Sequence, residues 1–391
     1  MGPLTRPPSV REPGEFDLQE LQVLAGGAAL ARLRHLTQRF HLAFPNGTGQ
    51  AKVWHVNSSG AGGGVADILT SLVALSNQIG IPARWLVIGG DEGFFEITKT
   101  FHNALQGNPD VEITAEMLLH YQHTTAANAR MLEGLIAERK WSPPDVIVFH
   151  DPQPAGLIDH WRATFPDTLF VWRGHVQFDI PAMTPSHPGC RVWDWLLRYV
   201  NQCDAAIFHL PEQVPPGLTI PVRCFLPSID PCGYLNRDLT APTGEKFIRS
   251  TLKKYQMGQL QDRSIPLVAQ IARFDRWKDP LGVIQAYQEA AARLPGNGRS
   301  PHLLLAGPLA EDDPEALRVL AELHHAVNGI ETVHILPLSP KNIALTSEQA
   351  EALRDLGVDL RLLRLENLVD LEVNAFQTRA DVIIAKSLRE G

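Results

Sequence analysis

Residues that could do chemistry follow several short apolar runs of this chain. The run 146–149 is followed directly by His150 and Asp151, and Pro152 and Pro154 come close behind them. Because proline restricts the backbone, these prolines would hold an imidazole and a carboxylate in fixed positions. A histidine in such a place can be structural or catalytic, and the motif alone leaves both interpretations open.

A second polar cluster follows the apolar run 169–172. It begins with Arg173 and His175 and ends at Asp179. Side chains of these types can donate hydrogen bonds to hydroxyl groups and accept hydrogen bonds from them. A solvated loop would have the same composition, so a hydroxyl-binding site and a surface loop both remain open.

A basic turn follows the apolar run 267–272. Arg273 and Lys278 are five positions apart, with Arg276 between them. Two cations on a strand-to-helix turn could clamp a diphosphate and offset the charge that develops on a leaving nucleoside diphosphate. A solvated run of charges is the usual alternative. Because the whole chain carries a formal net charge of -8, three cations at the end of one strand favour the anion site.

A run of small residues, 60–64, separates the apolar run 53–56 from a helical pattern that begins near Val65. The free N–H groups at such a helix start could bind an anion. The dinucleotide fingerprint is not met, because Gly64 is followed by Val65 and glycines 89 and 90 stand where an acidic residue is expected. A nicotinamide-dependent dehydrogenase is therefore disfavoured. The remaining alternative is that the glycines only permit a tight turn.

The elements that must position these residues form an alternating pattern of strands and helices. Apolar runs without polar alternation, separated by helical patterns, predict parallel sheets that are covered on both faces. The predicted strands are 53–56, 84–88, 146–149, 169–172, 205–208, 267–272, 303–306, 333–336 and 382–385. Predicted helices include 18–39, 280–293 and 314–325. Ligands of such sheets bind beyond the carboxyl ends of the strands, which is where the polar motifs lie.

The pattern of elements divides the chain into two domains. It breaks at the proline-bracketed segment 227–231 and restarts at Pro266, so we predict domains over residues 51–228 and 229–391. Residues 1–50 form a lead-in. We expect its first ~15 residues, which contain four prolines, to be disordered and the rest to be helical.

Composition excludes several classes of protein. The net charge of -8 argues against nucleic-acid and membrane-surface binding, which usually need a basic face. No apolar run reaches the ~18 residues that span a bilayer. The four cysteines form no Cys-x-x-Cys pair and no charged-then-apolar leader precedes them, so disulfides and a zinc knuckle are not expected. We therefore expect a cytoplasmic protein.

Several of these motifs together resemble those of one known family. The residues that carry the resemblance are 55–58, 62–66, 98–107, 150–154, Trp172 and Arg173 with His175, 273–280 and the closing run 387–391. They resemble the trehalose glycosyltransferring synthases of family 4 of the retaining glycosyltransferases. The resemblance covers roughly residues 50–391. The basic turn and the closing Glu-Gly pair are shared by the whole superfamily, whereas 101–107 and 150–154 are typical of the trehalose branch.

The resemblance implies an α/β fold of the GT-B type, in which two doubly wound, Rossmann-like parallel-sheet domains face a cleft. It implies a hexosyltransferase that moves glucose from a nucleoside-diphosphate glucose to the anomeric hydroxyl of free glucose, with retention, giving α,α-trehalose. Its partners would be these small molecules. The chain could also pair with a second copy to form a homodimer. No cofactor is obligatory, because the departing phosphate oxygen can take the acceptor proton. There is no clear Asp-x-Asp motif for a metal, although Mg²⁺ could accompany the nucleotide.

The resemblance also implies roles for particular residues. The implied donor-binding residues are Gly62, Gly63, Gly64, Arg273, Lys278 and Glu390. The implied acceptor-binding residues are Asp151, Arg173 and His175. His150 would contact the donor sugar near its 6-hydroxyl, and it joins Arg273, Lys278 and Glu390 as the implied catalytic set.

The chain departs from the family at its end. Family members continue after the Glu-Gly pair into Phe-Gly-Leu and a second glutamate eight positions after the first, whereas this sequence stops at Gly391. We therefore expect an incomplete second domain, and a fragment of a longer product rather than a natural short form. Two alternatives to the implied activity remain: the same fold with a different sugar acceptor, or a truncated, non-catalytic module that binds nucleotide sugars.

Overall fold

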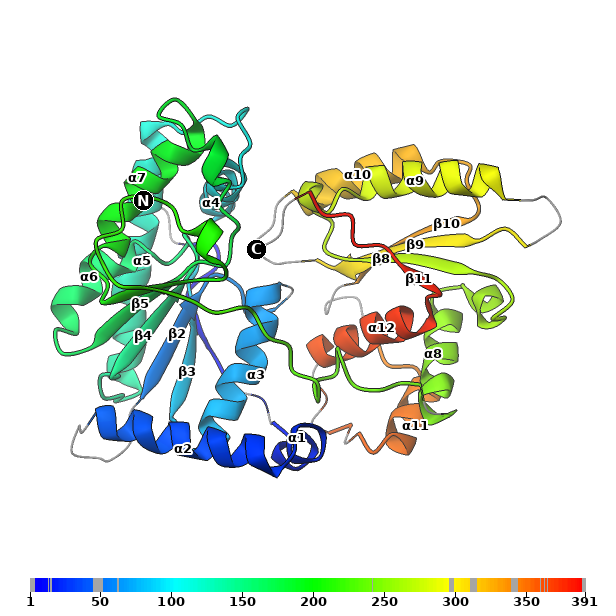
Figure 1. The fold of residues 1–391 in the computed structure, drawn as a ribbon, viewed down its shortest axis with the longest axis horizontal. Helices are drawn as coiled ribbons and strands as arrows, with labels where there is room; N and C mark the ends of the chain where they lie inside the picture. The colour runs from blue at the N-terminus through cyan, green and yellow to red at the C-terminus, as the bar shows by residue number, and fades with distance from the viewer. Residues whose placement is uncertain are drawn as a thin grey trace. The chain divides into compact units, whose positions relative to one another are not determined.

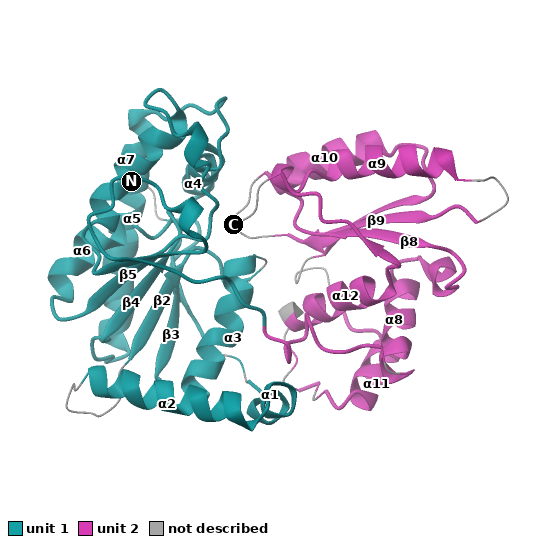
Figure 2. Ribbon diagram, in the orientation of Figure 1, with its two compact units in different colours: residues 1–229, 312–314, 390–391 teal, residues 230–311, 315–389 magenta. Residues whose placement is uncertain are grey.

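The chain forms two compact units, the first running to Ile229 and the second beginning at Asp230 (Figure 2). The computed structural model describes residues 4–12, 14, 16–44, 52–61, 63–240, 242–294, 299–309, 315–338, 344–358, 360–361, 363 and 365–388. The division between the units lies inside the proline-bracketed segment 227–231.

The first unit contains a seven-stranded sheet in the order β1-β3-β2-β4-β5-β6-β7 (Figure 1). Its strands are β1 (Ser9–Arg11), β2 (Val53–Asn57), β3 (Ala83–Val87), β4 (Val146–His150), β5 (Leu169–Arg173), β6 (Ala205–Phe208) and β7 (Val222–Cys224). Its helices are α1 (Leu18–Ala25), α2 (Gly27–Ala43), α3 (Gly64–Gln78), α4 (Glu92–Leu105), α5 (Ala115–Glu138), α6 (Leu157–Thr164) and α7 (Pro188–Val200), with 3₁₀ turns η1 (Ile180–Ala182) and η2 (Pro211–Gln213). Strands β2 to β7 pair in parallel, and only β1 runs antiparallel, to β3.

The second unit contains a parallel sheet of four described strands in the order β10-β9-β8-β11. These strands are β8 (Leu267–Ile271), β9 (His302–Pro308), β10 (Val333–Leu338) and β11 (Val382–Ile383). Its helices are α8 (Pro242–Lys254), α9 (Pro280–Arg293), α10 (Ala316–Ala326), α11 (Ser347–Asp355) and α12 (Leu365–Arg379), with 3₁₀ turns η3 (Gly258–Gln261) and η4 (Arg276–Lys278). Strand β11 is one of the two edge strands of this sheet, and both of its residues are half exposed.

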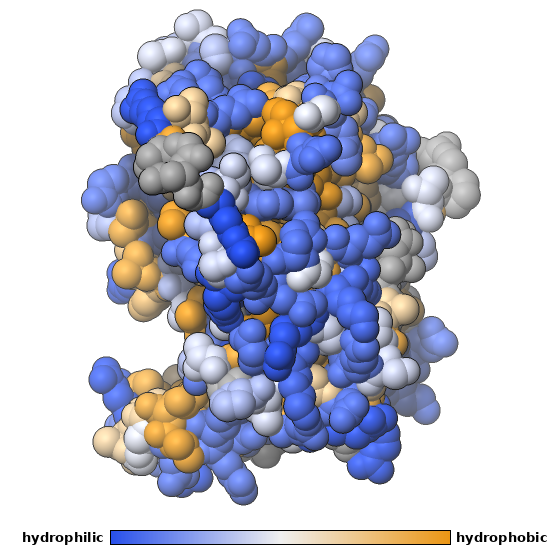
Figure 3. Space-filling view, turned by 90° about the vertical axis from the view of Figure 1, so that its right-hand side faces the viewer, coloured by the Kyte–Doolittle hydropathy of each residue, from blue (hydrophilic) through white to orange (hydrophobic). Residues whose placement is uncertain are grey.

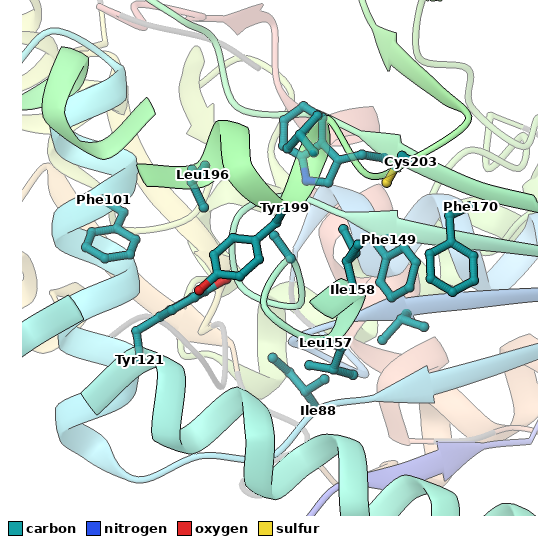
Figure 4. Packing of buried hydrophobic residues seen from close by; sticks show 14 of the residues in the cluster. Ile88, Phe101, Tyr121, Phe149, Leu157, Ile158, Phe170, Leu196, Tyr199 and Cys203 are labelled. Carbon is teal, nitrogen blue, oxygen red and sulfur yellow. The ribbon is translucent and has the colours of Figure 1, made fainter. Parts of the chain in front are cut away.

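Buried hydrophobic residues pack against both faces of each sheet. In the first unit Trp85 and Val87 pack with α3, whereas Leu86 belongs to the larger cluster around α4 to α7. Alternate residues of a strand point to opposite faces, so β3 supplies both cores. In the larger cluster Tyr121 and Tyr199 point toward each other, with 6.2 Å between ring centroids (Figure 4). Because the strands are buried on both faces, their sequences are unbroken apolar runs.

All nine predicted strands are present, with ends that differ from the prediction by at most two residues. The predicted helix 18–39 is instead two helices, because Gly26 between α1 and α2 has φ +81° and its N–H bonds to the Gln22 carbonyl. A residue in this left-handed conformation ends a helix, and glycine adopts it at little cost.

The N-terminal lead-in is also more ordered than the sequence predicts. Residues 9–11, which we expect to be disordered, form β1 along β3, and Arg6 exchanges two backbone hydrogen bonds with Gly90. A Cβ atom at Gly89 would lie 2.0 Å from the Arg6 carbonyl oxygen, so glycine is required there for this close approach. Glycines 89 and 90 therefore serve strand packing, and Pro7 and Pro8 lie just before the edge strand β1, in a place that tolerates proline.

Polar residues predominate on the face shown in Figure 3, and hydrophobic residues occur there in small separate groups. Among the described residues, no helix is both long enough and apolar enough to cross a bilayer. All four cysteines, each in a described segment, are free thiols.

Candidate active site

Three histidine side chains form a hydrogen-bonded row near the carboxyl ends of the strands in the first unit. His55 Nδ1 lies 3.1 Å from His150 Nε2, and His150 Nδ1 lies 2.9 Å from His175 Nε2. The strand order produces this row, because the rings come from β2, the end of β4 and the loop after β5, which are neighbours in the sheet. His209, directly after β6, continues it with its ring edge-on to His175 at 5.3 Å between centroids.

Burial keeps the histidine row uncharged. His55, His150 and His175 are at most 7% exposed. Desolvation is the largest cause that lowers the pKa of each ring, and the nearby Arg173 guanidinium lowers all three further, while Asp151 opposes the shift at His175. The pKa falls from 6.5 to about 4 for His55 and for His175, and to well below 6.5 for His150. At neutral pH the row therefore consists of neutral imidazoles.

Asp151 holds the loop that carries His175. Its backbone is in the left-handed region, with φ +65°, and its N–H donates to the Arg173 carbonyl at 2.8 Å. One carboxylate oxygen, Oδ1, accepts from the backbone N–H of His175 at 2.6 Å and of Val176 at 3.1 Å. The carboxylate thus has a structural task in this loop, and its implied contact with an acceptor stays a prediction.

Two buried polar atoms close to His150 have no hydrogen-bond partner among the described residues. They are Arg173 Nε, on the residue paired with His150 across β4 and β5, and Gln153 Oε1, three residues after His150. Desolvation lowers the pKa of Arg173, and Asp151 opposes this shift. A buried unpaired donor or acceptor costs about 1–3 kcal/mol. A polar ligand that satisfies both atoms would remove that cost.

The glycines at the start of α3 leave open space. Gly63 is the N-cap residue of α3 with φ −153°, and Gly64 is its first residue. A Cβ atom built on either glycine would meet no other atom of the described chain within 4 Å. The fold itself therefore does not require glycine at these two positions, and the bare backbone leaves room beside the free N–H groups of the helix. Gly62 lies outside the described residues.

We predict that Gly63→Ala and Gly64→Ala weaken donor binding without weakening the fold. Alanine fits both positions sterically. It favours the helix over glycine at Gly64, the first helical residue, but is the poorer cap at Gly63, so the melting temperature should change little in either variant. A methyl group would nevertheless occupy the space that a donor needs, so the KM for the nucleotide sugar should rise about tenfold. Steady-state kinetics and a melting curve test this together. An unchanged KM in both variants would show that these glycines do not approach the donor.

The predicted basic turn surrounds η4 in the second unit. The Asp275 side chain caps η4 by accepting from the Trp277 N–H at 2.8 Å, and Asp279, with φ +47°, caps α9 by accepting from the Gly282 N–H at 3.1 Å. Gln270 Nε2 donates to the Lys278 carbonyl at 2.6 Å. These caps fix the backbone that presents Arg273 and Lys278 just after β8.

A fourth cation joins this turn from the segment that follows β11. Lys386 forms an ion pair with Asp279, and the Leu388 N–H donates to the Trp277 carbonyl at 2.7 Å. The segment after β11 therefore returns to the basic turn that follows β8, its partner strand. Sequence reasoning does not assign Lys386 a role, because its approach depends on the pairing of β8 with β11. Glu390, the other implied residue of this segment, lies outside the described residues.

Sequence reasoning assigns no role to His55, at one end of the row, or to His209, beside its other end. His55 is the middle residue of an apolar strand and His209 follows another strand, and neither position signals a partner. Only the strand order β2-β4-β5-β6 brings them beside His150 and His175. The signal that could find them is the recurrence of histidine at or after successive strands of one sheet.

We predict that acidification below pH 6.5 destabilises the first unit. An unfolded histidine binds a proton near pH 6.5, whereas folded His55 and His175 resist protonation down to a pKa of about 4. Between these values the unfolded state binds more protons, so this stability is complete above pH 6.5 and is lost as the pH falls toward 4. Melting curves measured across this range test it. His55→Asn should flatten the dependence, whereas substitution of the exposed His325 should not; equal slopes in all three proteins would contradict the prediction.

The two units, each with a mainly parallel sheet covered by helices, have the fold of the GT-B glycosyltransferases. A solved α,α-trehalose-phosphate synthase (UDP-forming) from Burkholderia vietnamiensis superposes with a TM-score of 0.60 at 14% identity, covering 87% of this chain and 79% of that chain. A structure described as trehalose-6-phosphate from E. coli bound with UDP-2-fluoro glucose superposes with a TM-score of 0.57 at 13% identity. The superposition covers 87% of this chain and 79% of that chain. At these identities the similarity establishes the fold, which confirms the predicted fold class.

Sequence relatives identify the family. Residues 55–215 match the family described as trehalose synthase, N-terminal domain. A trehalose synthase from Pyrococcus horikoshii is 36% identical over 86% of this chain and 68% of its own length, and one from Rubrobacter xylanophilus is 32% identical over 87% and 70%. A trehalose phosphorylase from Pleurotus pulmonarius is 28% identical over 72% of this chain and 40% of its own. The chain belongs to the trehalose synthase family of glycosyltransferases.

Proposed function

We propose that this chain transfers glucose from a nucleoside-diphosphate glucose to the anomeric hydroxyl of free glucose, with retention, to form α,α-trehalose. The observation that carries the proposal is the 36% identity over 86% of the chain to a protein named trehalose synthase. The free space beside Gly63 and Gly64 and the unpaired atoms of Arg173 and Gln153 support it, because each suits a polar ligand.

The proposed step breaks the bond between C1 of the donor glucose and the diphosphate oxygen. The anomeric oxygen of the acceptor forms the new bond to C1 on the face that the diphosphate leaves. The proton of the acceptor hydroxyl passes to the departing phosphate oxygen, so no side chain needs to act as a base. Arg273 and Lys278 would stabilise the negative charge that grows on the diphosphate, and they are presented by the capped turn after β8.

The donor sugar would be held by the residues that the family resemblance assigns. These are Gly62, Gly63 and Gly64 beside the diphosphate or the sugar, and Glu390 at the sugar hydroxyls. The resemblance also assigns His150 to the 6-hydroxyl of the donor sugar, although both of its ring nitrogens contact other imidazoles, at 3.1 and 2.9 Å. The acceptor would lie near Asp151, Arg173 and His175. No group of three or more potential metal ligands occurs among the described residues. Mg²⁺ would accompany the nucleotide.

Incubation of the 391-residue chain with glucose and, separately, with the uridine, adenosine and guanosine diphosphate glucoses tests the proposal. The expected result is release of nucleoside diphosphate together with a non-reducing disaccharide. If nucleoside diphosphate is released only with a sugar other than glucose as acceptor, the chain is a transferase of the same fold with a different acceptor. A raised melting temperature with a nucleotide sugar, but no transfer or hydrolysis, would identify a binding module and overturn the proposal.

A phosphorolytic reaction is the second candidate, because the chain is also 28% identical to a trehalose phosphorylase over 72% of its length. In that reaction inorganic phosphate would attack trehalose and release free glucose with glucose 1-phosphate. Incubation with trehalose and phosphate, followed by measurement of glucose 1-phosphate, separates the two reactions. Sedimentation measurements on the same purified protein test whether it forms the homodimer that the resemblance implies.

A further inference from the structure

His150 has both ring nitrogens occupied by other imidazoles. Its Nε2 lies 3.1 Å from His55 Nδ1, and its Nδ1 lies 2.9 Å from His175 Nε2. The ring is 1% exposed, so it is shielded from bulk water. A neutral imidazole has one nitrogen that donates and one that accepts. Each of the two contacts must therefore contain one proton, shared between two rings.

These constraints leave only two arrangements of the three protons. If His150 carries its proton on Nδ1, it donates to His175 Nε2, and His175 must then carry its own proton on Nδ1. In the same arrangement His150 Nε2 accepts from His55 Nδ1–H. If His150 instead carries its proton on Nε2, both neighbours must also be protonated on Nε2. Any mixed arrangement places two protons or two lone pairs face to face across a buried contact.

We propose that His55, His150 and His175 act as a single tautomeric unit, with all three protons on Nδ1 or all three on Nε2. A hydrogen bond fixed at one end ring therefore fixes the proton of the ring at the other end. The ring nitrogens outside these two contacts are His55 Nε2 and His175 Nδ1, which form the two ends of the unit. His150 is in this respect a positioning residue, which passes the state of one end ring to the other.

The surroundings favour neutral rings in this unit. Arg173 of β5 disfavours a positive charge on each of the three rings, and His209 after β6 disfavours it on His175. Asp151, in the loop after β4, favours a charge on His175 only, and burial outweighs it. The rings also follow one another in a row through successive N···N contacts, and no group of three or more potential metal ligands exists among the described residues. Proton arrangement is thus the property that these contacts control.

Nuclear magnetic resonance of ¹⁵N-histidine-labelled protein at pH 7.5 tests the proposal without any substrate. Long-range couplings within each ring report which nitrogen carries the proton, and single substitutions assign the three rings. We expect one common tautomer in all three. Different tautomers among them, or a doubly protonated ring at this pH, would overturn the proposal. Since no turnover is involved, this result is independent of the proposed function.

Two substitutions at opposite ends should drive the unit in opposite directions. His55→Asp places an oxygen that only accepts near the position of Nδ1, which requires His150 Nε2–H and, two rings away, His175 Nε2–H. His175→Glu places such an oxygen near the position of Nε2, which requires Nδ1–H on both His150 and His55. A far ring with the other tautomer in either variant would contradict the coupling. If one variant does not fold, the other and the wild-type protein still give an answer.

A kinetic test of the same proposal is also possible, and it rests on the proposed function. His55→Asn keeps a polar group near the position of Nδ1 and should retain activity within about threefold, whereas His55→Phe leaves a buried nitrogen of His150 unpaired and should lower kcat/KM about tenfold or more. A matched control is His302→Phe, which breaks the other His-His pair of the described chain, His302 Nδ1 to His334 Nε2 at 2.9 Å in the second unit. This control should leave kcat/KM unchanged. Equal losses in the Asn and Phe variants of His55 would contradict a positioning role.

Discussion

Arg273→Ala and Lys278→Ala are each expected to lower kcat/KM by roughly 100- to 1,000-fold. The reason is that a positive charge on this turn interacts most strongly with the diphosphate as it leaves, when its negative charge is greatest. The caps at Asp275 and Asp279 hold the turn through backbone hydrogen bonds, so removal of either cation should change the melting temperature little. Steady-state kinetics with the best donor, measured beside melting curves, give both quantities.

Arg276 on the same turn provides the matched control for this prediction. It is an exposed cation whose guanidinium lies over the ring of Trp277, 5.4 Å from the centroid. Arg276→Ala removes the same charge from η4 but should change kcat/KM by less than about threefold, because exposed charges are screened by solvent. Similar losses in all three variants would indicate a general electrostatic effect. Unchanged kinetics in Arg273→Ala and Lys278→Ala would remove the clamp from the mechanism.

The strands of both sheets could be predicted because each is buried on two faces. Runs such as 146–149 and 303–306 contain no polar alternation, and that pattern is characteristic of parallel strands between layers of helices. Polar residues that directly follow such strands lie at the edge of the sheet where the carboxyl ends of the strands meet. This holds for any order of the strands within the sheet. This rule places His150 and His175 at one edge of the sheet, where His150 Nδ1 and His175 Nε2 are 2.9 Å apart.

The partners of these residues could not be predicted, because they depend on contacts between distant segments. His55 meets His150 only because β2 lies beside β4, a neighbour 95 residues away in the sequence. β1 forms because Arg6 and residues 9–11 reach β3, and the composition of that segment gives no sign of such pairing. The split of the helix predicted at 18–39 has a local signal, the two glycines 26 and 27, but helical periodicity on both sides of them outweighs it.

Asp151→Ala is expected to lower both the stability of the first unit and its activity. The substitution removes the acceptor of two buried backbone N–H groups, those of His175 and Val176, and leaves alanine at φ +65°. Each unpaired N–H costs about 1–3 kcal/mol, and the left-handed backbone costs about 1–2 kcal/mol more for alanine. We therefore expect a loss of at least about 3 kcal/mol in the free energy of unfolding, measured by denaturant titration. The loop that carries His175 would lose its anchor, so kcat/KM should fall about 100-fold.

Two further substitutions separate the role of the Asp151 side chain from a general loss of structure. Asp151→Asn keeps an acceptor oxygen and a residue type that tolerates the left-handed region, so it should recover most of the stability. Asp145→Ala removes a carboxylate just before the other end of β4, where it accepts from the Lys52 N–H at 2.7 Å. That change should destabilise the unit by about 1–2 kcal/mol and leave kcat/KM nearly unchanged. If the Asn variant is as unstable as the Ala variant, the negative charge of Asp151, rather than its two hydrogen bonds, holds the loop, and the position of His175 then depends on attraction to the nearby Arg173.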